Sequence, residues 1–173
     1  MKKISFCFVI IALLVLSFQS VNAQTESPEE TAKIQKFLAA KYPKEEAEGR
    51  KFMYASVDLN DDGKNEYIVG LVGTSFCGSG GCTMLVLNNA FKQTSAFTVV
   101  DYPIYIGAPA SKEVTKKYSN LYAYSKGKGY VMLSWNGTKY GPSNASTAPK
   151  VSDDIKNGKV PFLEMPATKV YSF

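Results

Sequence analysis

The spacing of hydrophobic and polar residues predicts one helix near the start of the chain. Ser27, Pro28 and Glu30 form a helix start, as an N-cap residue, a first-turn proline and the N3 member of a capping box. Pro43 then ends the helix. One apolar face follows from residues at helical spacing, namely Ile34, Phe37, Leu38 and Tyr42.

From Lys51 onward the pattern favours β-strands, because runs rich in β-branched and aromatic residues alternate with turn residues. Two runs, 67–72 and 83–87, are continuously apolar, which indicates central strands covered on both faces. Pro103 divides a weaker run in two, while 125–129 and Asn136-Gly137 predict hairpin turns. The candidate strands are 52–57, 67–72, 83–87, 120–124, 130–135 and 138–140, with 96–102 and 104–106 as weaker candidates.

The expected fold class is α+β, with one N-terminal helix followed by an antiparallel β meander of five to seven strands. Residues 141–150 predict a loop, because Gly, Pro, Ser, Asn and Ala dominate there. The pattern leaves open whether the tail at 161–173 docks on the sheet.

Composition narrows the class of function. A hydrophobic content of 45% is typical of a folded protein, and residues 24–173 suffice for a single domain. The formal net charge is +5, or +3 without Lys2 and Lys3, and the charges are scattered, so nucleic acid is not an expected partner. The sequence contains no histidine, which excludes Ser-His-Asp and Cys-His catalysis and imidazole zinc sites.

Residues 1–23 are typical of a secretory signal peptide. Lys2 and Lys3 precede an apolar stretch, and Val21-Asn22-Ala23 predicts cleavage before Gln24. An uncleaved anchor is the alternative, but the apolar stretch is short for a membrane span. We therefore expect a periplasmic or secreted protein with no stable membrane insertion after signal removal.

Cys77 and Cys82 are the two cysteines of the mature chain, in the segment Cys-Gly-Ser-Gly-Gly-Cys. An even number of cysteines in an exported protein predicts a disulfide bond. A redox-active pair or a metal pair is the alternative, although four intervening residues differ from the Cys-x-x-Cys spacing of both.

An Asp-rich loop, residues 58–66, is the chemical motif of the sequence. Asp58, Asn60 and Asp62 alternate before Gly63, and Glu66 follows, so that their oxygens and the Lys64 carbonyl can face a common centre. Such hard oxygen donors suit Ca²⁺, in a structural rather than a catalytic role. The motif is not an EF-hand, because Val69 occupies the position of the bidentate glutamate. A hairpin turn without an ion is the alternative.

The Asp-rich loop resembles the D-x-[DN]-x-D-G-x-x-[DE] loop of FG-GAP and VCBS-type repeats. The resemblance implies Ca²⁺ ligands at Asp58, Asn60, Asp62, the Lys64 carbonyl and Glu66. The propeller of those repeats is not implied, because the loop occurs once here. From Tyr54 to Tyr140 the order of features also resembles small exported bacterial proteins of unassigned function, which implies a single exported domain without supplying an activity.

The second half of the mature chain is rich in tyrosine and lysine. A partner surface is one interpretation, since tyrosine gives large contact area, and ordinary strand composition is the other. The candidate surface residues are Tyr122, Tyr124, Lys126, Lys128 and Tyr130.

The sequence leads to two hypotheses of function. The first is an exported, non-enzymatic binding or inhibitor-like domain with a structural Ca²⁺ loop, whose partner is an unknown protein or envelope ligand. The alternative is a small metal-assisted hydrolase that uses Asp58, Asp62 and Glu66.

Overall fold

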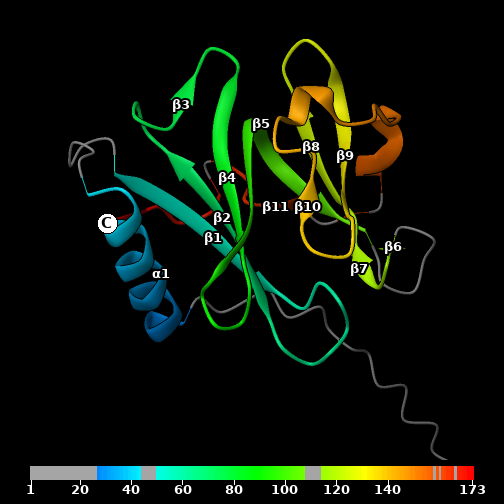
Figure 1. The fold of residues 1–173 in the computed structure, drawn as a ribbon. Helices are drawn as coiled ribbons and strands as arrows, with labels where there is room; N and C mark the ends of the chain where they lie inside the picture. The colour runs from blue at the N-terminus through cyan, green and yellow to red at the C-terminus, as the bar shows by residue number, and fades with distance from the viewer. Residues whose placement is uncertain (1–26, 44–49, 108–113, 158, 160, 166) are drawn as a thin grey trace, which may run out of the picture.

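The structure is a computed structural model, which describes residues 27–43, 50–107, 114–157, 159, 161–165 and 167–173. One α-helix, two short 3₁₀ helices and a series of strands make up this part of the chain (Figure 1). They are α1 (Pro28–Lys41), β1 (Lys51–Val57), β2 (Glu66–Val72), β3 (Cys77–Gly78), β4 (Gly81–Leu87), β5 (Gln93–Ile106), β6 (Val114–Thr115), β7 (Tyr118–Ser119), β8 (Leu121–Ser125), β9 (Gly129–Trp135), β10 (Tyr140–Gly141), η2 (Ala145–Thr147), η3 (Asp153–Lys156), β11 (Pro161–Phe162) and β12 (Tyr171–Ser172).

The strands form an antiparallel meander, as the sequence predicts. The main sheet has the order β10-β9-β8-β5-β4-β2-β1-β12, with β3 beside β4 and β11 beside β5. The expected number of five to seven strands is wrong, because this sheet has 10 strands within the described residues and β6 and β7 form a separate pair. The extra strands are two-residue segments too short to produce a periodic pattern. Two of them, β11 and β12, dock the tail on the sheet.

Strand β5 lies at the centre of the fold and joins two halves of the sheet (Figure 1). Its first half pairs with β4 and its second half with β8 and β11. The predicted break at Pro103 is wrong, because β5 continues to Ile106. The pairing with β8 skips from Asp101 to Tyr105, so the missing N–H of Pro103 removes no hydrogen bond from this ladder.

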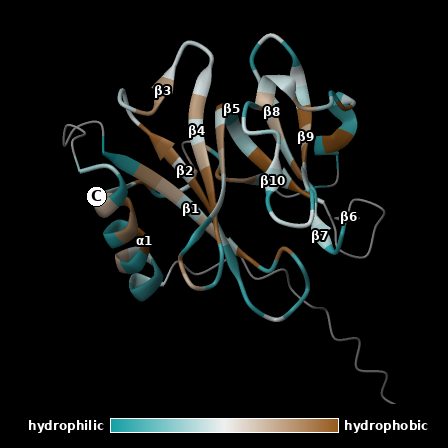
Figure 2. Cartoon of the chain, in the orientation of Figure 1, coloured by the Kyte–Doolittle hydropathy of each residue, from teal (hydrophilic) through white to brown (hydrophobic). Residues whose placement is uncertain are grey.

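Two hydrophobic cores lie on opposite faces of β2. Tyr67, Val69 and Leu71 belong to the core beneath α1, whereas Ile68 and Val72 belong to the larger core that includes β8 and β9 residues. Every residue of β2 is buried, as expected for a central strand covered on both faces. Figure 2 shows hydrophobic residues concentrated in β2 and neighbouring strands and hydrophilic residues along α1.

The helix begins at Pro28, but the predicted capping box does not form. The Ser27 side chain makes no cap hydrogen bond, and its carbonyl instead accepts from Thr31 N–H at 2.9 Å. Glu30 turns towards the sheet, where it accepts hydrogen bonds from Tyr67 and Ser56. Tertiary contacts therefore replace the local contact that the sequence predicts.

Candidate ion-binding loop

The Asp-rich loop connects β1 to β2, directly after the Val57–Glu66 pair that ends their ladder. Leu59 anchors it, since this side chain is fully buried in the larger core. Gly63 has φ +79°, a left-handed conformation that glycine adopts without strain, and permits the turn back towards β2. The loop is thus fixed at both ends, where β1 and β2 pair and where Leu59 enters the core.

Backbone N–H groups of the loop converge on its own side-chain oxygens. The Asp58 carboxylate accepts hydrogen bonds from Asn60, Asp62 and Gly63, the last at 2.7 Å. Asn60 Oδ1 accepts from Asp62 N–H at 3.0 Å, and Asp62 Oδ1 accepts from Lys64 N–H at 2.9 Å. These contacts hold the three side chains on the inner side of the turn.

Glu66 is the buried member of the predicted ligand set, with 6% of its surface exposed. Its Oε2 accepts a hydrogen bond from Leu59 N–H at 3.0 Å. Burial raises the pKa of Glu66, and the charges of Asp62 and Asp58 raise it further, although the hydrogen bond from Leu59 opposes them. The carboxylate is therefore in a place that disfavours its negative charge.

No cation in the described part of the chain pairs with these carboxylates. The one ion pair found there joins Lys33 and Glu29 on α1, at 2.7 Å. The oxygen donors suit Ca²⁺ chemically. However, the described side chains form no group of three or more Cys, Asp or Glu residues arranged to hold a metal ion. Ion binding would therefore require Asp58, Asp62 and Glu66 to turn further inward.

The loop also contacts β7, which the sequence did not predict. Ser119 N–H donates to the Leu59 carbonyl at 2.7 Å, and Asn60 Nδ2 donates to Tyr118 Oη at 3.0 Å. The Tyr118 ring stacks on Trp135, with centroids 4.2 Å apart. Nothing in the sequence indicates a contact between positions 58 residues apart.

The candidate partner surface is only partly exposed. Tyr124 is 38% exposed and Lys126 is exposed, but Tyr122 is 3% exposed and lies inside the fold. Lys128 is half-buried, and its Nζ donates to the Ser146 carbonyl at 2.8 Å. The half-buried Tyr130 contacts Tyr124 edge to face at 5.4 Å. Only Tyr124, Lys126 and part of Tyr130 are therefore available to a partner.

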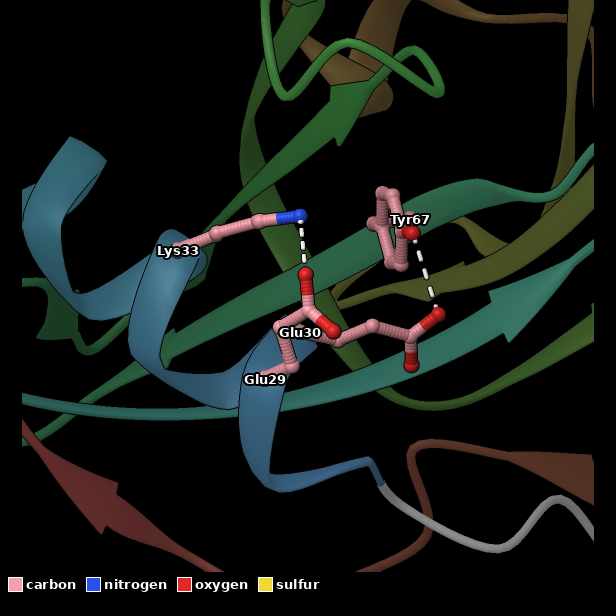
Figure 3. Close-up of polar contacts among 4 residues, drawn as sticks. All are labelled: Glu29, Glu30, Lys33 and Tyr67. Atoms are coloured by element: carbon pink, nitrogen blue, oxygen red, sulfur yellow. Dashed lines mark hydrogen bonds and ion pairs between the residues drawn. The ribbon is translucent and has the colours of Figure 1, made fainter.

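A second polar cluster connects α1 to β2 (Figure 3). Tyr67 Oη donates to Glu30 at 3.0 Å, and Lys33 pairs with Glu29 on the same helix. Phe91 stacks on the Tyr67 ring, with centroids 4.5 Å apart, and Lys33 Nζ lies 5.2 Å from the Phe91 ring centroid. Burial raises the pKa of Tyr67, and the Glu30 hydrogen bond raises it further. A phenol kept neutral in this way serves to dock the helix.

A disulfide joins Cys77 and Cys82, as the sequence predicts. The two residues are directly opposite each other in the β3–β4 hairpin. Gly81 completes the hairpin at φ +127°, where an added Cβ would lie 2.9 Å from the backbone of Val99 and Val100. The disulfide is compatible with a protein outside the cytoplasm, while the predicted signal peptide, 1–23, lies outside the described residues.

No described helix is long and apolar enough to cross a membrane. No protein-family model, curated protein or solved structure gives a significant match to the chain.

Proposed function

We propose that this chain is an exported, non-enzymatic binding domain in which the Asp-rich loop holds a structural Ca²⁺ ion. Asp58, Asn60, Asp62, the Lys64 carbonyl and Glu66 are the proposed ligands, and the partner is a protein or envelope ligand. The ion would supply positive charge that stiffens the β1–β2 connection.

One observation carries the proposal: a buried carboxylate, Glu66, faces the charges of Asp58 and Asp62 with no cation beside it in the described residues. Burying an unpaired charge is unfavourable, and a divalent cation would remove the repulsion among the three groups. Five oxygen donors would leave one or more of the six to eight Ca²⁺ positions to water.

A non-enzymatic role is preferred over a metal-assisted hydrolase. Besides burial, the charges of Asp62 and Asp58 raise the pKa of Glu66, and both acids are on its own loop. Asp101 is opposite Tyr124 on the β5–β8 ladder, and the charge of Glu164 affects Tyr105, which is also on β5. These acids therefore belong to the other half of the sheet. The hydrolase hypothesis requires an acid–base group next to the ion, and neither of these acids supplies one.

Isothermal titration of residues 24–173 with Ca²⁺, after treatment with EDTA, tests the ion site. We expect one ion per chain, strongly weakened binding in Asp58→Asn, and unchanged stoichiometry in Asp61→Asn. Asp61→Asn is the matched control, because Asp61 lies outside the ligand set and asparagine tolerates its φ of +58°. Absence of heat in the wild-type protein, or equal binding by Asp58→Asn, would contradict the proposal.

A further inference from the structure

Tyr118 approaches the Asp-rich loop from outside it. It lies on β7, and its hydroxyl oxygen accepts a hydrogen bond from Asn60 Nδ2 at 3.0 Å. The neighbouring backbone contact, Ser119 N–H to the Leu59 carbonyl at 2.7 Å, fixes β7 beside the loop. The side-chain contact therefore comes from a firmly held strand.

The Asn60 amide is fully used in this arrangement. Its Nδ2 donates to Asp62 Oδ2 at 3.1 Å as well as to Tyr118, and its Oδ1 accepts from Asp62 N–H at 3.0 Å. Because the amide group is planar, fixing both N–H bonds also fixes the direction of Oδ1. Without the Tyr118 hydroxyl, one of these N–H groups loses its protein acceptor, and the amide keeps its two hydrogen bonds with Asp62, which constrain its direction less.

We infer that Tyr118 is a positioning residue of the ion site, which orients the Asn60 oxygen towards the ion without touching it. The inference rests on the proposed function. Outer-shell partners that orient a metal ligand typically contribute 10-fold to 100-fold to affinity.

The Tyr118 ring is itself held in place. It stacks on Trp135 at 4.2 Å with an interplanar angle of 21°, and Tyr140 is nearly perpendicular to it at 88°. On the turn before Tyr118, Lys116 Nζ donates to the Asn136 carbonyl at 2.6 Å. Trp135 is the one tryptophan of the chain, so its emission reports on the ring that contacts the loop.

Ca²⁺ titration of the wild-type chain, Tyr118→Phe and Tyr124→Phe tests the inference, by calorimetry and Trp135 emission. Phenylalanine keeps the stacked ring and removes only the hydroxyl. We expect the dissociation constant to rise 10-fold to 100-fold in Tyr118→Phe, with an unchanged melting temperature in EDTA. The exposed Tyr124 lies on β8 and packs against Tyr130 rather than against the loop, so Tyr124→Phe should bind as the wild type does. Trp135 emission should change with Ca²⁺ in the wild-type protein.

A double-mutant cycle separates positioning from a general structural effect. Asn60→Ser keeps a ligand oxygen but is too short to reach Tyr118, so Tyr118→Phe should have no further effect on affinity in this background. Equal Ca²⁺ affinity of wild type and Tyr118→Phe, or the same loss in the Asn60→Ser background, would overturn the inference while leaving the ion site intact. If the wild-type chain binds no Ca²⁺, the proposed function fails and the inference with it.

Discussion

Leu59 donates its backbone N–H to Glu66 Oε2 at 3.0 Å, across the Asp-rich loop. The same residue buries its side chain in the larger core. The contact therefore ties the end of the loop to its anchored beginning, and it places the Glu66 carboxylate where water does not reach it freely. The charge of Glu66 opposes folding unless a cation compensates it, which gives the loop a distinctive pH dependence.

In EDTA, the free energy of unfolding should rise as the pH falls. The folded state raises the Glu66 pKa, so it binds this proton more tightly than the unfolded state does. The unfavourable contribution is complete above the raised pKa, shrinks as the pH falls through it, and is absent below the ordinary value of 4.5. The Glu66 charge also acts on Tyr140. Burial and that charge both raise the pKa of Tyr140, which therefore stays neutral between pH 4 and 7.

Urea unfolding of the wild-type chain and Glu66→Gln at pH 7, 6, 5 and 4 measures this contribution. Glutamine keeps an oxygen for Leu59 N–H and removes the charge, so it should be the more stable form at pH 7, and the difference should vanish near pH 4. Glu66→Ala should instead lose about 1–3 kcal/mol, because it leaves that N–H without an acceptor. A difference between wild type and Glu66→Gln that does not change with pH would contradict the account.

Two glycines of the β3–β4 hairpin should respond differently to alanine. At Gly81, a Cβ would lie 2.9 Å from the β5 backbone, and φ is +127°. Overpacking and backbone strain together should cost about 2 kcal/mol or more. Gly78 has open space around it, so Gly78→Ala should stay within about 0.5 kcal/mol of wild type. Chemical denaturation measures the free energy of unfolding of both variants. Equal losses in Gly81→Ala and Gly78→Ala would contradict the close approach of Gly81 to the β5 backbone.

Removal of the disulfide should destabilise the chain moderately without unfolding it. Closing so short a loop contributes about 2 kcal/mol in the chain-entropy model. The Cys77→Ser, Cys82→Ser double variant should therefore lose about that much free energy of unfolding and keep its circular dichroism spectrum. Both cysteines are half-buried, and β4 keeps its pairing with β2 and β5 when the sulfur bridge to β3 is removed, which is why the fold should survive. Loss of folded spectrum at 25 °C would refute this view.

Tyr67→Phe should weaken the attachment of α1 to the sheet. The substitution keeps the stack on Phe91 and removes the hydrogen bond to Glu30, which should cost about 1 kcal/mol. Lys33→Ala is a control for charge, since the Lys33–Glu29 pair is exposed and screened by solvent, so its loss should affect stability little. Hydrogen exchange of α1 amides should accelerate in Tyr67→Phe. Unchanged exchange would assign the docking to the apolar contacts alone.

The sequence predicts the parts of the fold that depend on local patterns. The bounds of α1, β2 and β9, the hairpin at 125–129 and the disulfide follow from periodicity, turn residues and cysteine number. The continuation of β5 through Pro103 does not, because it depends on the register shift between Asp101 and Tyr105 in the pairing of β5 with β8. The direction of the Glu30 side chain on α1 likewise depends on its hydrogen bond from Tyr67 on β2.

For the candidate site, the sequence locates the loop and its oxygen donors, but not their surroundings. The burial of Glu66 results from Leu59 entering the core, and the Asn60–Tyr118 hydrogen bond results from the position of β7. Both are consequences of tertiary packing, which residue spacing does not encode. The same holds for Tyr122, whose burial depends on what covers its face of the sheet.

Thermal unfolding of residues 24–173 in EDTA and then in Ca²⁺ tests the central claim most directly. Binding to the folded state alone at 100 times the dissociation constant adds about 2.7 kcal/mol, which corresponds to a rise of roughly 5–10 °C in melting temperature for a domain of this size. The account predicts this rise in the wild-type chain and in Asp61→Asn, and its loss in Asp58→Asn. An unchanged melting temperature at saturating Ca²⁺, or an equal rise in Asp58→Asn, would contradict the account and make the Asp-rich loop a turn without an ion.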